Sequence, residues 1–104
     1  MMQSGYEIEQ VFIRKRSGRY EFLIVSLAPS GAPRRETFTY DAPNTLTAVQ
    51  KASRQLAGRG DTEQVDKLRL RVETRGSLHD DASLKRAFVE TFKDVRDDMD
   101  DNFL

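Results

Sequence analysis

The sequence contains no cysteine and no tryptophan, and it has a single histidine among its 104 residues. The absence of cysteine excludes disulfide bonds, thiolate metal ligands and a cysteine nucleophile, and it is compatible with a reducing compartment. No apolar run approaches the roughly 20 residues of a membrane-spanning helix, and the start of the chain lacks the basic and apolar regions of a secretory signal peptide. We therefore expect a cytoplasmic protein with no membrane partner and no cofactor.

An excess of charge of either sign is also missing. Lys and Arg number 17 and Asp and Glu number 17, which gives a formal net charge of zero. Bulk charge therefore favours neither a nucleic acid nor a membrane as a partner. The charges are unevenly distributed, because residues 1–76 contain 13 basic and 9 acidic side chains whereas residues 77–104 contain 4 and 8. Any electrostatic function must come from this asymmetry.

The first 40 residues predict three antiparallel strands. β-branched and aromatic residues are concentrated at Tyr6–Ile13, Tyr20–Leu27 and Arg34–Tyr40. Turn residues separate these segments, at Ser17-Gly18 and in the proline-containing stretch 29–33. We expect two consecutive hairpins.

Two helices and a fourth strand are predicted after residue 40. The first helix, of about three turns, is indicated by Leu46, Val49, Ser53 and Leu56, is capped by Asn44 or Thr45 and stops at Gly58. Strict alternation over residues 67–73 predicts a strand with one buried face and one basic, solvent-exposed face. The second helix begins near Asp80.

The predicted order β-β-β-α-β-α is typical of a two-layer α+β sandwich, with a four-stranded, mainly antiparallel sheet and two helices on one face. A length of 104 residues and a hydrophobic content of 38% fit one folded domain over residues 1–104.

The register of the hairpins determines which face of the sheet forms the core. Centring the hairpins on Ser17-Gly18 and Ser30-Gly31 places Phe12, Leu23 and Phe38 side by side. The core face then consists of Ile8, Phe12, Leu23, Val25, Leu27, Phe38 and Tyr40. The opposite face presents an uncovered apolar patch made of Val11, Ile13, Phe22 and Ile24. An odd-numbered loop in either hairpin would exchange some of these assignments.

The second helix carries two opposed stripes. Its apolar stripe is expected to pack on the core and consists of Leu84, Phe88, Phe92, Val95, Met99 and Phe103. The acidic helix face lies about half a turn away and consists of Glu90, Asp94, Asp97, Asp98 and Asp101. These carboxylates approach the C-terminal end of the helix, where the helix dipole repels each by about 0.3–1 kcal/mol. We therefore expect the helix to fray from about residue 97.

No set of residues amounts to a recognisable catalytic, metal-binding or nucleotide-binding motif. A solvent-facing position in the first turn of the helix explains His79 better than a catalytic role does. The carboxylate-rich segment 94–102 lacks the ligand spacing and the glycine of a calcium loop. Gly58-Arg59-Gly60 lacks the lysine and the further glycines of a phosphate-binding loop. We expect a protein that is not an enzyme.

Two surfaces remain for a protein partner. The acidic helix face suits a partner with a basic surface and, in the extreme, imitates the phosphates of a nucleic acid; a simple solvated helix face is the competing interpretation. The apolar patch of Val11, Ile13, Phe22 and Ile24 would be closed by a homodimer or another protein. The sequence thus favours a small non-catalytic binding module, of accessory or inhibitor type.

A nucleic-acid-binding domain is the alternative. Basic residues are predicted at the first hairpin tip and on the strand 67–73, with Tyr20 or Phe22 as a stacking surface for an unpaired base. The basic set comprises Arg14, Lys15, Arg16, Arg19, Lys67, Arg69 and Arg71. Charge on a hairpin tip and on an exposed strand also suppresses aggregation, which makes nucleic acid the second choice.

Overall fold

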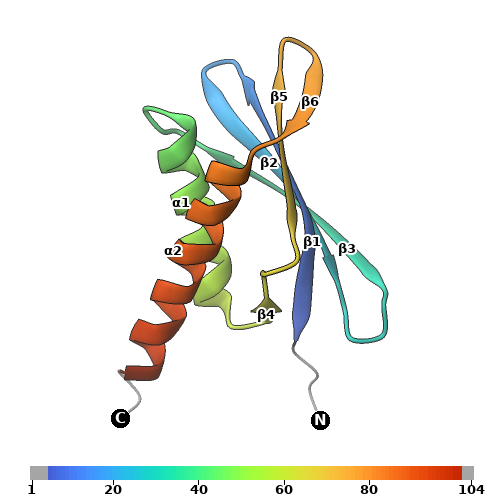
Figure 1. The fold of residues 1–104 in the computed structure, drawn as a ribbon, viewed down its shortest axis with the longest axis vertical. Helices are drawn as coiled ribbons and strands as arrows, with labels where there is room; N and C mark the ends of the chain where they lie inside the picture. Colours follow the sequence, from blue (N-terminus) through green and yellow to red (C-terminus); the bar gives the residue numbers. More distant parts are fainter. Residues whose placement is uncertain (1–4, 102–104) are drawn as a thin grey trace.

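The computed structural model describes residues 5–101 and, in the last helix, side chains as far as Met99. It is an α+β fold in which a sheet and two helices form two layers (Figure 1). The elements are β1 (Tyr6–Arg16), β2 (Arg19–Leu27), β3 (Pro33–Tyr40), α1 (Thr45–Arg59), β4 (Thr62–Gln64), β5 (Arg69–Thr74), β6 (Ser77–Asp80) and α2 (Ala82–Asp101).

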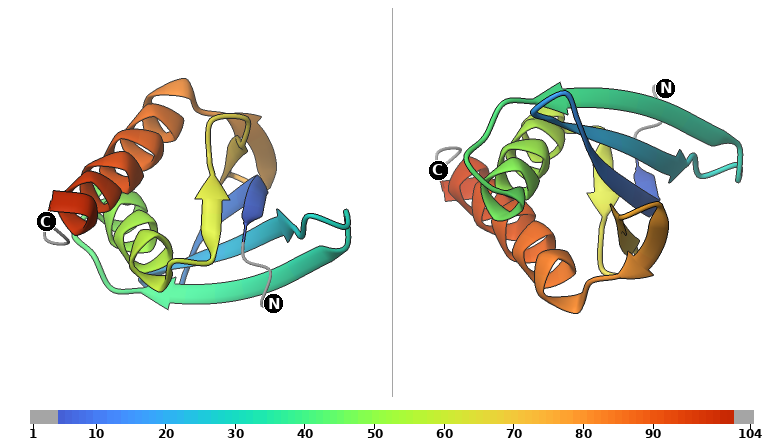
Figure 2. Two further views of the ribbon diagram at one scale, coloured as in Figure 1. Left: turned by 90° about the horizontal axis from the view of Figure 1, so that it is seen from below. Right: turned by 90° about the horizontal axis from the view of Figure 1, so that it is seen from above.

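The sheet is larger and more mixed than the sequence predicts. Its strands follow the order β3-β2-β1-β5-β6, and β4 pairs with the first residues of β1. Strand β1 is antiparallel to β2 but parallel to both β4 and β5. The predicted four-stranded, mainly antiparallel sheet is therefore wrong in strand number and in the pairing of its central strand. The α+β class with two helices is confirmed, and both helices lie against one face (Figure 2).

Two similar turns close the hairpins β1–β2 and β5–β6. Ser17-Gly18 has φ values of 52° and 78°, and Arg75-Gly76 has 54° and 81°, so both central residues are left-handed as in a type I′ turn. Because the chain reverses at Arg75-Gly76, residues 77–80 pair with β5 before the second helix begins. His79 consequently lies in β6 and not, as predicted, in the first turn of a helix.

The first hairpin has the predicted register and the second does not. Phe12 pairs with Leu23 as expected, but a β-bulge between Ile8 and Gln10 turns Ile8 to the other face. The loop from β2 to β3 spans residues 28–32, an odd number, so Phe38 pairs with Phe22 instead of Leu23. This shift by one residue exchanges the two faces of β3.

Both shifts place the core on the face opposite to the predicted one. The residues predicted as an uncovered patch are at most 1% exposed, namely Val11, Ile13, Phe22 and Ile24. The bulge adds Ile8 to this face, and the shifted register adds Phe38 and Tyr40. It thereby becomes an almost unbroken apolar surface, whereas charged side chains interrupt the other face. Continuity across neighbouring strands explains why the helices cover this side.

Helix α1 has well-defined caps at both ends. The Asn44 side chain accepts a hydrogen bond from the backbone N–H of Thr47 at 2.8 Å, which agrees with the predicted N-cap. The C-cap is Gly60, which is left-handed at φ 80°. The helix therefore continues through Gly58, where the sequence predicts its end.

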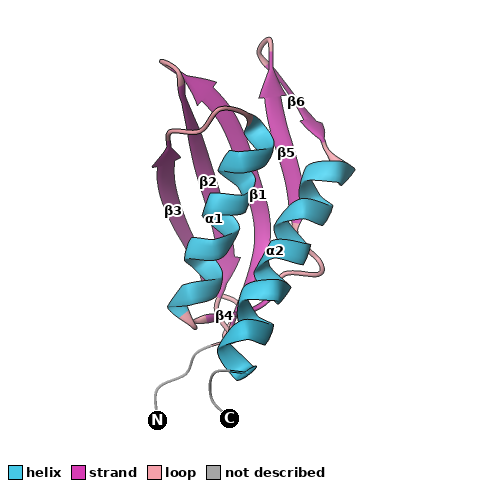
Figure 3. Cartoon of the chain, turned by 90° about the vertical axis from the view of Figure 1, so that its left-hand side faces the viewer, coloured by secondary structure: helices cyan, strands magenta, loops and turns pink. Residues whose placement is uncertain are grey.

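Helix α2 lies beside α1 and runs in the same direction (Figure 3). Its first turn is capped by Asp81, whose carboxylate accepts a hydrogen bond from the backbone N–H of Leu84 at 3.0 Å. Phe88 and Phe92 are buried in the core, on the face opposite to Phe12 and Leu23 against which they were expected. Met99 is 40% exposed, and Phe103 lies outside the described residues. Fraying after Asp97 stays a prediction.

A cluster of four charged side chains ties β3 to the end of α1 and the start of β4. Arg59 contacts Glu36 at 2.7 Å and Asp61 at 2.8 Å, and Arg34 contacts Asp61 at 2.8 Å. The Arg34 guanidinium also lies over the Tyr6 ring, 3.7 Å from its centroid. Desolvation by itself raises the pKa of Asp61, but the hydrogen bonds from the two arginines outweigh it and lower that pKa to about 2.

Candidate functional site

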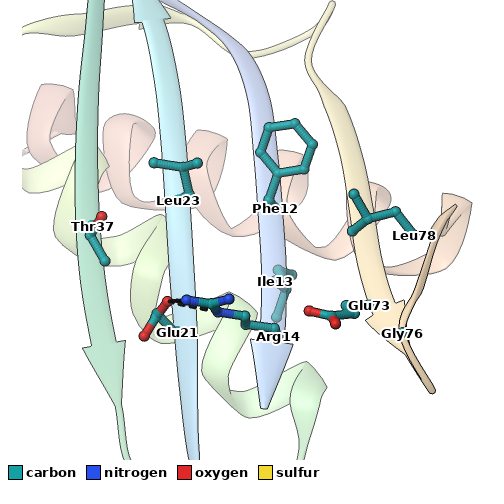
Figure 4. A pocket seen from close by; sticks show the side chains of 9 residues that line it. All are labelled: Phe12, Ile13, Arg14, Glu21, Leu23, Thr37, Glu73, Gly76 and Leu78. Atoms are coloured by element: carbon teal, nitrogen blue, oxygen red, sulfur yellow. Dashed lines mark hydrogen bonds and ion pairs between the residues drawn. The ribbon is translucent and has the colours of Figure 1, made fainter. Parts of the chain in front are cut away.

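One face of the sheet is not covered by either helix, and its middle is apolar. Phe12, Leu23 and Val25 are half-buried there, and Leu78 is 49% exposed. A concavity of about 550 Å³, here called the sheet pocket, opens on this face (Figure 4). Its lining comprises Phe12, Ile13, Arg14, Glu21, Leu23, Thr37, Glu73, Gly76 and Leu78.

Polar side chains surround the apolar middle, and most of them are paired with one another. Arg14 donates to Glu21 across the hairpin at 2.8 Å, at one end of the sheet pocket (Figure 4). Arg69 donates to Asp80 at 2.9 Å. These pairs compensate much of the charge of the uncovered face.

Arg71 lies against the apolar middle rather than reaching away from the domain. Its guanidinium is centred over the Phe12 ring at 4.7 Å, and its Nη2 donates to the Gln10 side chain at 2.9 Å. Both contacts keep this cation close to the sheet. One side of the Phe12 ring is therefore already occupied.

A second concavity, the inter-hairpin cleft, lies between the tips of the hairpins β1–β2 and β5–β6 and measures about 430 Å³. It shares part of its lining with the sheet pocket, so the two are neighbours. Its lining comprises Arg14, Lys15, Arg16, Glu73, Thr74, Arg75 and Gly76. Among residues 5–99, the side chains of Lys15, Arg16 and Arg75 form no ion pair with a carboxylate.

The predicted nucleic-acid-binding residues do not form one free basic surface. Arg14, Arg19 and Arg69 each pair with a carboxylate of the same domain, namely Glu21, Asp41 and Asp80. Lys67 lies in the turn before β5 and not on the strand. The two predicted stacking rings are also wrong, because Tyr20 is 6% exposed and Phe22 is fully buried.

The acidic helix face is exposed as far as the structure describes it. The side chains of Glu90, Asp94, Asp97 and Asp98 point to solvent, and none forms an ion pair with residues 5–99. The side chain of Asp101 lies outside the described part. The C-terminal end of α2 and the two hairpin tips lie at opposite ends of the molecule (Figure 1). The charge asymmetry of the sequence is therefore also an asymmetry in space.

Groups typical of an enzyme or a metalloprotein are few among the described residues. His79 is exposed, and its Nε2 lies 3.4 Å from the Thr74 hydroxyl. No group of three metal-ligating side chains occurs within residues 5–99. The helices described between residues 5 and 101 include none that is long and apolar enough to cross a membrane.

Three residues that line the two concavities of the uncovered face were missed by sequence reasoning. Glu73 and Leu78 pair across β5 and β6, and Arg75 forms the turn between them. The dipeptide Arg75-Gly76 was the available signal, because a glycine preceded by a polar residue between alternating segments is compatible with a two-residue turn. Arginine is unusual at the first turn position, which is why the signal is weak.

Comparison of the chain with protein-family models, with curated proteins and with solved structures gives no match.

Proposed function

We propose that this protein is a small non-catalytic binding module that acts through protein–protein contacts on the uncovered face of its sheet. The observation that carries the proposal is the apolar middle of that face, with Phe12, Leu23, Val25 and Leu78 left accessible on one side of a folded domain. An apolar centre within a polar rim is the usual anatomy of a protein interface. The residues differ from those predicted, but the kind of surface is the same.

The pairing of charges around this centre favours a protein over a nucleic acid. Arg14 and Arg69 are engaged by Glu21 and Asp80, so they are less able to neutralise phosphates. The accessible apolar side chains are mostly aliphatic and offer little area on which bases stack. Internally paired charges at the rim of an apolar patch instead tolerate partial exclusion of water by a docked protein.

The acidic helix face provides a second contact, for a partner with a basic surface. Its four described carboxylates form no ion pair with residues 5–99, and Asp97 and Asp98 lie near the C-terminal end of the helix, where the helix dipole disfavours them. Unpaired charges of one sign mainly accelerate association by steering an oppositely charged protein. Because this surface and the uncovered sheet face lie on different sides of the molecule, we assign them separate roles (Figure 2).

A single-stranded nucleic acid is the second candidate, and one observation favours it. The turn of β5–β6 adds Arg75 to the cations of the first hairpin, at the inter-hairpin cleft. Binding of this kind would weaken steeply with salt, by about 0.7 in the logarithmic slope for each phosphate neutralised on a single strand. A titration of a mixed-sequence oligonucleotide at two salt concentrations tests this candidate.

Two leucines of nearly equal exposure allow a matched test of the proposed function. Leu78 lies on the uncovered face at 49% exposure, and Leu46 lies on α1 at 47%. We expect Leu78→Gln to weaken capture of a native partner, and its affinity once purified, by about tenfold or more. Leu46→Gln should leave both unchanged. Equal effects of the two substitutions would refute a role for the uncovered face.

A homodimer is one form that the proposed contact can take. Sedimentation of the wild-type protein at micromolar concentration measures it directly. A dimer that Leu78→Gln dissociates, and Leu46→Gln does not, would identify the second copy as the partner. A monomer in both cases leaves a different protein as the partner.

A further inference from the structure

The sheet pocket and the inter-hairpin cleft adjoin and form one continuous concave surface, which has an apolar part and a cationic part. They share Arg14, Glu73 and Gly76 in their linings. The apolar part is made by Phe12, Leu23 and Leu78. A peptide segment of a docked protein that places one side chain in the sheet pocket therefore has its adjacent residues near the cleft. The chemistry of both parts together specifies the ligand more closely than the apolar patch alone.

The residues that line this concave surface carry a net positive charge. Arg14, Lys15, Arg16 and Arg75 line it together with only two carboxylates, those of Glu21 and Glu73. The charge of Arg14 is compensated by Glu21, whose Oε1 lies 2.5 Å from the Arg14 Nη2. The uncompensated positive charges therefore belong to the cleft. The Lys15 ammonium lies 5.5 Å from the centroid of the Tyr20 ring, which is buried on the covered face, so the uncompensated cations on the side of the cleft are Arg16 and Arg75. The cleft therefore favours an anionic group.

Arg75 places a cation at the cleft in a backbone position that usually holds another type of residue. Its φ of 54° is left-handed, and the first central position of a type I′ turn is usually Asn, Asp or Gly. A residue with a long side chain gains nothing for the turn itself. It does add a cationic residue to those that line the cleft, which also include Arg16.

We propose that the cleft recognises a carboxylate of the docked protein, from an Asp or Glu side chain next to an apolar residue that occupies the sheet pocket. This inference rests on the proposed function. A single carboxylate satisfies the cations of the cleft without approaching Glu21. A nucleic-acid strand would carry further phosphates past both Glu21 and Glu73, which repel them. The observations thus favour an apolar–acidic peptide segment.

Short peptides that carry only these two groups test the proposal. The probes are acetyl-Leu-Asp-amide and its versions with one or two glycines between the two residues, each paired with an Asn version of the same shape. Amide chemical shifts of the full chain report where each peptide binds. For at least one spacing we expect the Asp peptide to bind about five to ten times more tightly than the Asn peptide. Its shifts should include both Leu78 and Arg75.

Substitutions at the cleft should move this preference in opposite directions. Arg75→Asn removes the cation and supplies a residue that suits the left-handed turn, so the fold is retained. It should reduce the preference for Asp to about twofold or less, and leave the Asn peptide unaffected. Glu73→Gln removes a repelling carboxylate and should increase the preference. Arg54→Gln, an exposed cation on α1, is the control that changes nothing.

Several results would overturn the proposal. One is equal binding of the Asp and Asn peptides at every spacing, and another is the absence of shifts with any peptide at about 20 mM. A tetranucleotide that binds the same residues more tightly than every peptide would replace the peptide by a nucleic acid. If Leu78→Gln weakens partner capture but Arg75→Asn does not, only this inference fails. If Leu78→Gln has no effect on capture, the proposed function itself fails.

Discussion

Along β2 the two faces of the sheet carry equal numbers of large apolar side chains, yet only one of these faces became the core. On the covered face, Ile13, Phe22 and Phe38 adjoin across three strands without interruption. On the uncovered face, Leu23 lies beside Phe12 on one side but beside Thr37 on the other. The difference shows that continuity between strands, more than apolar content along one strand, decides which face receives the helices.

The largest expected effect on the free energy of unfolding comes from comparing two consecutive residues of β2 whose side chains lie on opposite faces of the sheet. Phe22 is fully buried and Leu23 is half-buried on the uncovered face. Phe22→Ala should lower the free energy of unfolding by about 3–5 kcal/mol, because it removes burial and leaves a cavity. Leu23→Ala should cost about 1 kcal/mol or less. Urea denaturation measures both values, and similar losses would contradict the assignment of the faces.

An intermediate effect on stability is expected when the pH is lowered, because acid protonates Asp61 in the cluster of four charged side chains. Asp61 has its pKa lowered from 3.8 to about 2 in the folded state, so its charge stabilises the fold above pH 3.8 and this contribution disappears as the pH falls towards 2. Solvent reaches part of the side chain, which limits the contribution to about 1–2 kcal/mol. Asp61→Asn should therefore flatten the fall in stability between pH 4 and 2.

The exposed pair of the uncovered face provides the comparison for that experiment. Arg69 hydrogen-bonds to Asp80 and lowers its pKa, but both side chains are more than half exposed. Asp80→Asn should thus leave the pH profile of stability almost unchanged. If Asp80→Asn and Asp61→Asn flatten the profile equally, the cluster beside the core has no special role.

The smallest effect on stability is expected at the acidic helix face. Replacing Asp94, Asp97 and Asp98 by Asn relieves repulsion from the helix dipole and should leave the free energy of unfolding unchanged or raise it by a few tenths of a kcal/mol. Association with a basic partner should become slower and less sensitive to salt. Stopped-flow association at two ionic strengths measures this. An unaltered rate would leave a solvated helix face as the only interpretation.

The sequence predicted those features that depend on short stretches of chain. The register of the first hairpin and the cap at Asn44 follow from a few local residues. The apolar stripe of α2 also appears where it was expected, with Phe88 and Phe92 buried. Each of these features is determined within one hairpin or one helix.

Which face of the sheet forms the core was not predictable in the same way. It depends on single extra residues in a strand or loop, each of which turns the neighbouring side chains to the other face. One extra residue in the bulge after Ile8, and an odd loop between β2 and β3, redirect Ile8, Phe38 and Tyr40 to the other side. The candidate site depends on the same choice, since Leu23 belongs to it only if Phe22 belongs to the core. Arg75 remained hidden because arginine rarely occupies a left-handed turn position.

The parallel arrangement of α1 and α2 gives this chain of zero net charge an electrical polarity. Both helices begin near the hairpin tips and end near the acidic end of α2, so their partial charges reinforce the side-chain charges at each end (Figure 3). A neutral body with separated poles experiences little net force in a uniform field, but it experiences a torque. An approaching charged partner therefore also turns this protein before contact, so that electrostatics orients the encounter in addition to accelerating it.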